Sequence, residues 1–341
     1  MAYTTIDDPE KYFQVKAYDG TGSSLAVTFD GDTDLQPNLV WLKRRSGSGN
    51  HFLYDSVRGA NRSLVPNDTD VEDTSGESTN YLSSFDSDGI TLGGSYNNTN
   101  ASGSTYVAWC WKEDSTAGFD IVTFTGNQTA RTISHSLGVK PQWMWIKNRE
   151  KVESWHSYHT TQGATKSAET NGTGAYSSAA TIWNNTEPTT SVFTVGNNGN
   201  INENGSGIVV YLWSGIKGFS KFGKYEGNNN ADGPYVFAGF RPAFVMIKRA
   251  GGANGWFLSD TKRVGFNGVA TNSATVGNPE LSPNLARYEA EGNTNWVDIY
   301  SNGFKPRITG NDTNGASETY VYMAFAYQPM VNSDGIHSNA R

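Results

Sequence analysis

Residues 37–44 read Pro-Asn-Leu-Val-Trp-Leu-Lys-Arg, and this pattern occurs three times in the chain. It returns as Pro-Gln-Trp-Met-Trp-Ile-Lys-Asn at 141–148 and as Pro-Ala-Phe-Val-Met-Ile-Lys-Arg at 242–249. Each copy is a continuous apolar run behind a proline, which is typical of a central β-strand that is buried on both faces. A proline at the first position of such a strand removes no hydrogen bond that the sheet needs.

The three copies stay in register beyond this strand. Twelve residues after each lysine stand Asp55, His159 and Asp260, and each is followed by Ser or Thr. Each copy later closes on an aromatic run, at 106–111, 208–213 and 320–325. The stretches between are rich in Asn, Gly, Ser and Asp, which favour turns. The repeat has the size of a small domain, whereas solenoid repeats span roughly 20–50 residues.

We therefore predict an all-β chain of three tandem β-sandwich units, jelly-roll-like, with about seven or eight short strands in each unit. A propeller is the weaker alternative, because a blade needs only about 40–50 residues. The predicted parts are an N-terminal arm at 1–16, units at 17–115, 116–218 and 219–329, and a polar C-terminal tail at 330–341. We expect the tail to be mobile or docked on a partner.

Composition excludes several classes of protein. The net charge of -7 and the pI near 5.3 argue against binding to nucleic-acid phosphates. The single cysteine, Cys110, excludes a disulfide framework and a multi-cysteine zinc site, and we expect it to be a buried small hydrophobe. The longest apolar runs, 208–213 and 320–327, fall far short of the roughly 20 residues of a membrane-spanning helix. Residues 1–8 show neither a basic nor an apolar region, so we expect no signal peptide.

The recurring polar residues have a structural and a functional interpretation. Lys43, Lys147 and Lys248 could present a ligand contact three times, but a lysine that hydrates the turn at a strand end is the favoured interpretation. Asp55 and Asp260 are each followed three residues later by an arginine, which predicts a turn closed by a side-chain ion pair.

No candidate catalytic, cofactor-binding or metal-binding residue emerges. His156 and His159 are three apart, and on a strand such positions face opposite sides. The runs 30–34 and 67–70 resemble fragments of calcium loops, but the first has Leu35 and Trp41 where a calcium loop needs Gly and Glu. The Gly-Ser-Gly runs lack a strand–elbow–helix context, and no spacing pairs two carboxylates for glycoside cleavage. We expect most tryptophans, such as those at the repeated positions 41 and 145, to lie in the core.

Residues 1–9, Met-Ala-Tyr-Thr-Thr-Ile-Asp-Asp-Pro, resemble the start of virion structural proteins of marine tailed phages, particularly phages of cyanobacteria. The resemblance continues through the runs at 39–44, 54–59, 85–90, 106–112 and 218–223, and it covers about residues 1–329. It implies a non-enzymatic component of the virion surface and assigns no catalytic residues. The second unit departs from the pattern at His159 and at 183–185, so we expect it to face a different partner or to pack differently.

The expected function is that of a tail fibre or tail appendage that contacts the host surface. Capsid decoration or a head appendage is the alternative, and a polysaccharide-degrading tail enzyme is less favoured. A secreted adhesin would need a signal peptide. The expected partners are other virion proteins, further copies of the chain with a trimer favoured, and a host surface glycan or protein. We expect synthesis in the host cytoplasm, no cofactor, no nucleic acid and no membrane insertion.

Overall fold

The computed structural model describes residues 3–74, 81–263, 281–289 and 296–337. Nearly all regular structure in these residues is antiparallel β-sheet, which confirms the predicted all-β class. The helical elements are single turns: η1 (Pro9–Lys11), α1 (Ala180–Trp183) and α2 (Gly199–Asn202). Met1, Ala2 and the last four residues of the predicted tail lie outside the described residues.

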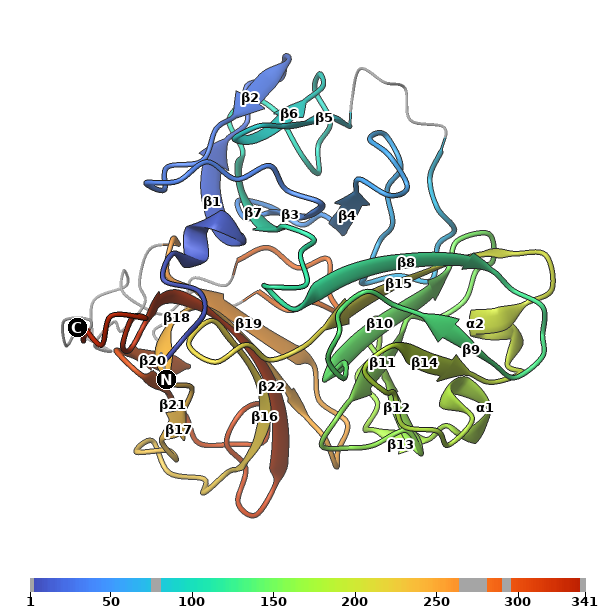
Figure 1. Ribbon diagram of the computed structural model, residues 1–341. Helices are drawn as coiled ribbons and strands as arrows, with labels where there is room; N and C mark the ends of the chain where they lie inside the picture. Colours follow the sequence, from blue (N-terminus) through green and yellow to red (C-terminus); the bar gives the residue numbers. More distant parts are fainter. Residues whose placement is uncertain (1–2, 75–80, 264–280, 290–295, 338–341) are drawn as a thin grey trace.

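The strands fall into three groups along the chain (Figure 1). The first group contains β1 (Phe13–Asp19), β2 (Leu25–Val27), β3 (Leu39–Arg44), β4 (His51–Asp55), β5 (Leu82–Asp86), β6 (Gly89–Leu92) and β7 (Thr105–Trp111). The second contains β8 (Phe119–Thr125), β9 (Arg131–Ser134), β10 (Trp143–Asn148), β11 (His156–His159), β12 (Lys166–Glu169), β13 (Ser177–Ser178), β14 (Val192–Val195) and β15 (Gly207–Trp213). The third contains β16 (Ser220–Glu226), β17 (Val236–Phe237), β18 (Phe240–Arg249), β19 (Trp256–Asp260), β20 (Val297–Tyr300), β21 (Gly303–Pro306) and β22 (Thr319–Pro329).

The larger sheets share one strand order. It is β1-β7-β3-β4 in the first group, β8-β15-β10-β11 in the second, where β12 and β13 extend the sheet, and β16-β22-β18-β19 in the third. A smaller sheet accompanies each: β2-β6-β5, β9-β14 and β17-β21-β20. The strand register agrees with the alignment of the three repeats. Equivalent positions pair in each large sheet: Trp41 with Trp109, Trp145 with Tyr211, and Met246 with Met323.

The apolar run that identifies the repeat forms β3, β10 and the end of β18, each between two neighbouring strands and almost fully buried, as predicted. The proline positions differ from the prediction. Pro37 and Pro141 lie two residues before their strands, and Pro242 lies inside β18. The ladder between β18 and β22 shifts register on both sides of Pro242. This irregularity accommodates a residue that has no N–H to donate.

The N-terminal arm is shorter than predicted. Strand β1 begins at Phe13 and pairs with β7, because Phe13 and Val15 are apolar and reach the core. The residues before it lie against the third group, where Tyr3 donates to the Gly239 carbonyl at 2.9 Å. The start of the predicted tail also docks on this segment, since the Ser333 N–H donates to Asp7 Oδ1 at 2.6 Å. The described segments that adjoin the two termini, around Asp7 and Ser333, therefore lie side by side (Figure 1).

An aromatic centre joins the three groups. Ring centroids lie 5.4 Å apart for Trp41 and Trp145, from the first and second groups. They lie 6.2 Å apart for Trp109 and Phe244, from the first and third groups, and 6.0 Å apart for Trp143 and Trp256, from the second and third. Such pairs contribute roughly 0.5–1.5 kcal/mol each beyond their buried area.

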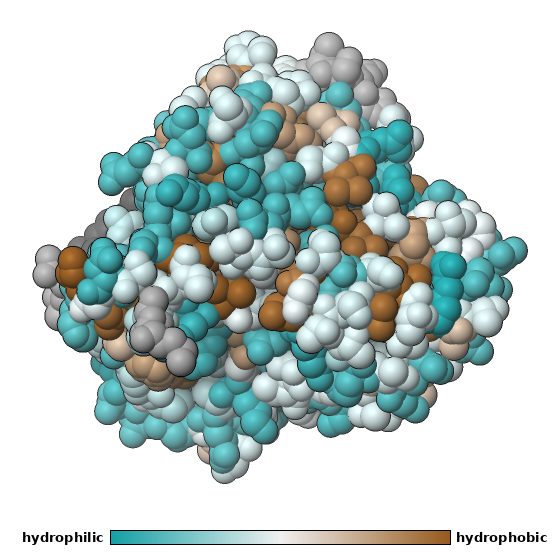
Figure 2. All heavy atoms as spheres, in the orientation of Figure 1, coloured by the Kyte–Doolittle hydropathy of each residue, from teal (hydrophilic) through white to brown (hydrophobic). Residues whose placement is uncertain are grey.

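The largest hydrophobic cluster runs through all three groups, and two smaller clusters lie inside the second and first groups. The core placement predicted for the recurring tryptophans and for Cys110 is confirmed. Because the core crosses the boundaries between the units, the division into three separate units stays a prediction. In Figure 2 hydrophilic side chains dominate the surface, and hydrophobic ones gather where the groups meet.

Candidate functional site

The three groups are joined in a ring by the segments that follow β4, β11 and β19. We call residues 56–74, 160–176 and 281–289 the crossover segments, because each lies against the next group. The Glu72 N–H donates to the Arg149 carbonyl at 2.7 Å, and the Tyr176 N–H donates to the Ala250 carbonyl at 2.9 Å. The Glu289 N–H donates to the Arg45 carbonyl at 3.0 Å and closes the ring from the third group to the first.

In each group, a ring nitrogen at the equivalent position bonds to a backbone carbonyl of a crossover segment. The three residues stand at the start of β4, just before β11 and at the start of β19. Trp155 Nε1 donates to the Val65 carbonyl at 2.9 Å, and Trp256 Nε1 donates to the Glu169 carbonyl at 3.2 Å. His51 Nδ1 accepts from Trp41 Nε1 at 3.0 Å, so Nε2 carries the proton and donates to the Ser282 carbonyl at 3.1 Å. Burial and the nearby Lys43 hold the pKa of His51 well below its usual value, which keeps the ring neutral.

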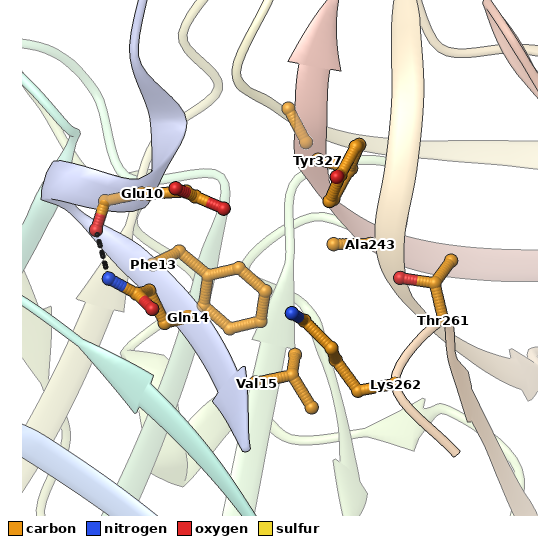
Figure 3. A pocket seen from close by; sticks show the side chains of 9 residues that line it. Glu10, Phe13, Gln14, Val15, Ala243, Thr261, Lys262 and Tyr327 are labelled. Carbon is orange, nitrogen blue, oxygen red and sulfur yellow. Dashed lines mark hydrogen bonds between the residues drawn. The ribbon is translucent and has the colours of Figure 1, made fainter. Parts of the chain in front are cut away.

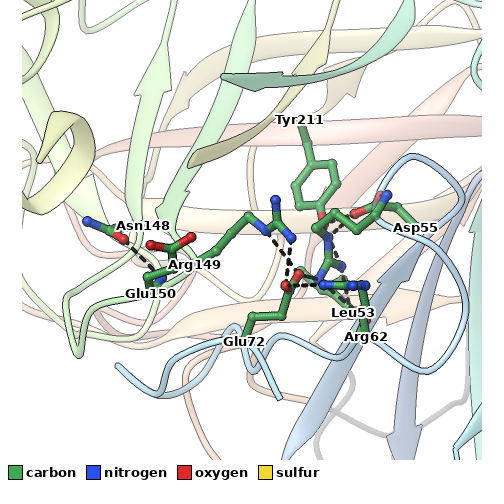
Figure 4. A network of polar contacts seen from close by, with 9 residues as sticks. Leu53, Asp55, Arg62, Glu72, Asn148, Arg149, Glu150 and Tyr211 are labelled. Carbon is green, nitrogen blue, oxygen red and sulfur yellow. Dashed lines mark hydrogen bonds and ion pairs between the residues drawn. The ribbon is translucent and has the colours of Figure 1, made fainter. Parts of the chain in front are cut away.

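Asp55 belongs to a buried polar network between the first and second groups (Figure 4). Its carboxylate accepts from the Arg58 backbone N–H at 2.8 Å and forms an ion pair with the Arg58 guanidinium. It also accepts from the Tyr211 hydroxyl at 2.7 Å. Arg58 continues to Glu72 at 2.8 Å, and Glu72 reaches Arg149 at 2.6 Å and 3.0 Å. The predicted Asp-x-x-Arg turn is confirmed, and it also connects two groups.

Asp260 repeats this arrangement between the third and first groups. It accepts from Arg263 Nε at 2.6 Å and from Trp109 Nε1 at 3.0 Å. Arg263 then contacts Glu289 at 2.8 Å, and Glu289 contacts Arg45 at 2.7 Å. Buried charges of this kind are tolerated only when each is paired and hydrogen-bonded.

The second group departs from this pattern at His159, as the sequence indicated. His159 Nδ1 lies 3.1 Å from the Thr161 N–H, and burial lowers the pKa of His159 to about 3. The residue in the place of Trp109 and Tyr211 is Met323, whose thioether has no N–H or O–H to donate. A neutral imidazole therefore takes the place of the carboxylate where the donor is missing.

The three recurring lysines are buried, which corrects the expectation that they hydrate strand ends. Lys147 Nζ donates to the Thr69 carbonyl of the first crossover segment at 3.2 Å. Lys248 Nζ donates to the Thr173 carbonyl of the second at 3.2 Å. Lys43 Nζ donates to the Arg44 carbonyl at 2.7 Å. Burial lowers the pKa of each of these three lysines to about 8.

The other residues that the sequence suggested as possible metal ligands form contacts within the protein or lie apart from any metal-binding cluster. Asp30 pairs with Lys16 at 3.5 Å and with Lys262 at 3.0 Å. Asn67 accepts from the His51 N–H at 2.7 Å. His156 and His159 both lie on β11. In the part of the chain that the structure describes, no three His, Cys, Asp or Glu side chains gather in a way that could hold a metal ion.

Three buried asparagines were missed in the sequence. Asn100, Asn202 and Asn314 each stand five residues before the last strand of their group, and each is fully buried. Their side chains accept from the Thr21, Asn127 and Asn228 N–H groups and donate to two loop carbonyls each. Their constant distance from the strand was a signal that could have found them.

Among the cavities lined by described residues, two lie outside these networks. The smaller, between Phe13 of β1 and Lys262 after β19, has about 20 Å³, room for about one water molecule (Figure 3). The larger, of about 400 Å³, lies in the second group beside His156 and Glu169. Its volume falls within the roughly 300–1,000 Å³ that is typical of small-ligand sites.

The chain belongs to the family described as Domain of unknown function (DUF7483), which matches residues 8–329. This one match spans all three groups of strands. No curated protein and no solved structure matches the chain. Within the described residues, no helix is long and apolar enough to cross a membrane.

Proposed function

We propose that this chain is a non-enzymatic structural protein on the surface of a tailed-phage particle, in a tail fibre or tail appendage that contacts the host. The phage assignment is supported by the sequence resemblance over residues 1–329. The structural role is supported by the ring of crossover contacts. Asp55 and Asp260 accept hydrogen bonds from Tyr211 and Trp109 of neighbouring groups. Lys147 and Lys248 donate to the first and second crossover segments, so these buried polar residues hold the groups together.

A rigid protein of this kind suits a virus particle that must keep its shape. The aromatic centre and the crossover contacts give three groups of strands a fixed relation to one another. Similar surfaces presented several times raise avidity for weak ligands without any strong single site. Homo-oligomers, with a trimer favoured, would multiply this effect. Capsid decoration is the alternative, and a decoration protein would need the same rigidity.

Immunogold electron microscopy tests the proposal, with antibody against the recombinant chain and purified particles of the phage that encodes it. Label at the distal tail is the expected result. Label spread over the head would replace the tail assignment with decoration. Intact particles without label, next to particles labelled by antibody against a known virion protein, would overturn the virion role.

A further inference from the structure

The cavity of about 400 Å³ in the second group lies between a sheet edge and two helical turns. Strands β11, β12 and β13 contribute His156, Ser167, Glu169 and Ser177, and the α1–α2 region contributes Thr181 and Asn198. Asn198 Nδ2 donates to Thr181 Oγ1 at 3.1 Å, which ties the two helical turns together at the cavity wall.

A change of residue type accompanies this cavity. Phe52 and Phe257 stand at the place of His156 in the other two groups, one residue after His51 and Trp256. Phe52 packs against Tyr96, with ring centroids 5.6 Å apart, and Phe257 packs against Trp296 at 5.3 Å. A phenyl ring thus fills this place in the first and third groups, whereas the second group has a smaller polar ring.

His156 is short of a hydrogen-bond partner at the cavity wall. Its exposed fraction is 7%, and Nδ1 lies 3.5 Å from Ser167 Oγ, a marginal contact. Nε2 is buried and has no hydrogen-bond partner. An unpaired buried polar atom costs roughly 1–3 kcal/mol, so such a group often marks a functional site. Burial and the positive charge of Lys147 lower the pKa of His156 to about 4, and the ring is neutral at neutral pH.

The chemistry of the lining selects the ligand. Hydroxyl groups of Ser177, Ser178 and Thr181 and the amide of Asn198 offer neutral donors and acceptors. The Ser167 hydroxyl donates to the Ser157 carbonyl at 3.1 Å and offers an acceptor. Glu169 adds one carboxylate, and no lysine or arginine belongs to the described lining, so anions such as phosphate are disfavoured. No Phe, Tyr or Trp belongs to the described lining either, which disfavours a flat apolar ligand.

We propose that this cavity binds one unit of a neutral saccharide, whose hydroxyl groups pair with the serine, threonine, asparagine and glutamate side chains. The proposal does not rest on the virion role, because it concerns binding by the isolated chain. It assigns saccharide binding to the second group alone, because phenylalanines stand at the equivalent place in the other two groups.

Saturation-transfer difference NMR on the full chain tests this proposal. The probes are glucose, galactose, mannose and N-acetylglucosamine, each at about 10 mM, which is enough to occupy a site of millimolar Kd. Saturation transfer to at least one sugar is expected. It should be lost in His156→Phe, which copies the residue of the other two groups, and in Ser177→Trp, which fills the cavity from an exposed position.

The controls separate the outcomes. Lys262→Ala, at the small cavity of Figure 3, should leave the saturation transfer unchanged. If His156→Phe fails to fold, Ser177→Trp alone decides, because its side chain is exposed and outside the core. No transfer to any of the four sugars would overturn the proposal, as would transfer that persists in a folded Ser177→Trp chain.

Discussion

The indole N–H of Trp109 donates a hydrogen bond of 3.0 Å to Oδ2 of Asp260, 151 positions later in the chain. The hydroxyl of Tyr211 makes the corresponding bond of 2.7 Å to Asp55. Where the donor position holds Met323, the acceptor position holds His159 instead of a carboxylate. Among the three groups, a buried carboxylate thus occurs where the neighbouring group supplies a hydrogen-bond donor. This is expected, because burying an unpaired charge costs free energy.

Replacement of Trp109 by Phe should destabilise the chain by about 2 kcal/mol more than replacement of Trp143 by Phe. Both changes remove the same atoms from a fully buried side chain. Only Trp109 Nε1 has a hydrogen-bond partner, since Trp143 Nε1 has none. Urea denaturation of the two variants measures the difference. Equal losses would show that the bond to Asp260 contributes nothing.

Replacement of Glu72 by Gln should lower the free energy of unfolding at pH 7 by about 2 kcal/mol, because charged hydrogen bonds to Arg58 and Arg149 are weakened. Hydrogen bonds and charges of these arginines hold the Glu72 pKa below its usual 4.5. The stabilisation is therefore present above about pH 4.5 and is lost as the pH falls through the folded value.

Denaturation at pH 7 and at pH 4 or below checks this prediction. The Glu72→Gln variant should lose less stability than the unmodified chain over that interval. Asp30→Asn is the control, because this half-exposed carboxylate pairs at the surface, where an ion pair contributes about 0–1 kcal/mol. A parallel pH dependence of the Glu72→Gln variant and the unmodified chain would contradict the prediction.

Lys43, Lys147 and Lys248 should titrate near pH 8, because burial disfavours their charged form. In the unfolded chain the same groups hold their protons up to about pH 10.4. Between these values the unfolded state binds more protons, so the contribution of these lysines to stability rises with pH.

NMR of lysine labelled at the side-chain carbons measures the titration directly. Single Lys→Met variants assign the three resonances, and the exposed Lys166 serves as a reference in the same sample. Three resonances with midpoints near pH 8 are expected. If every lysine resonance moved only above pH 10, the lysines would not be buried as described.

Gly89 should tolerate no side chain. Its φ is +112°, and a Cβ would lie 2.1 Å from the Val27 carbonyl oxygen. We expect Gly89→Ala to cost about 3 kcal/mol or more, since backbone strain and a clash with the neighbouring strand add.

Gly103 provides the matched control for this change. Its φ is +74°, and a Cβ there would meet nothing within 4 Å. Gly103→Ala should cost only the roughly 1–2 kcal/mol of a positive φ for an alanine. Thermal unfolding of both variants compares them, and similar losses would mean that the contact with Val27 is relieved by movement of the strands.

The sequence by itself determined the features that depend on short-range patterns. The apolar run of 39–44 and its two counterparts predicted buried central strands, because a strand covered on both faces needs continuous apolar residues. The aromatic runs predicted the core, and the spacing from Asp55 to Arg58 predicted a turn, since both partners lie within four residues. The three matching stretches predicted that one pattern of strands repeats, and the structure shows that the three large sheets share one strand order.

Only the tertiary structure decided what these elements meet. Lys147 looked like a strand-end lysine, yet it bonds to the Thr69 carbonyl 78 positions away. Asp55 finds Tyr211 across 156 positions. The cavity beside His156 also depends on the packing of α1 against β12 and on the hydrogen bond from Asn198 to Thr181. No spacing along the chain encodes such contacts, because they arise only when three groups of strands pack around one aromatic centre and burial changes what each polar group needs.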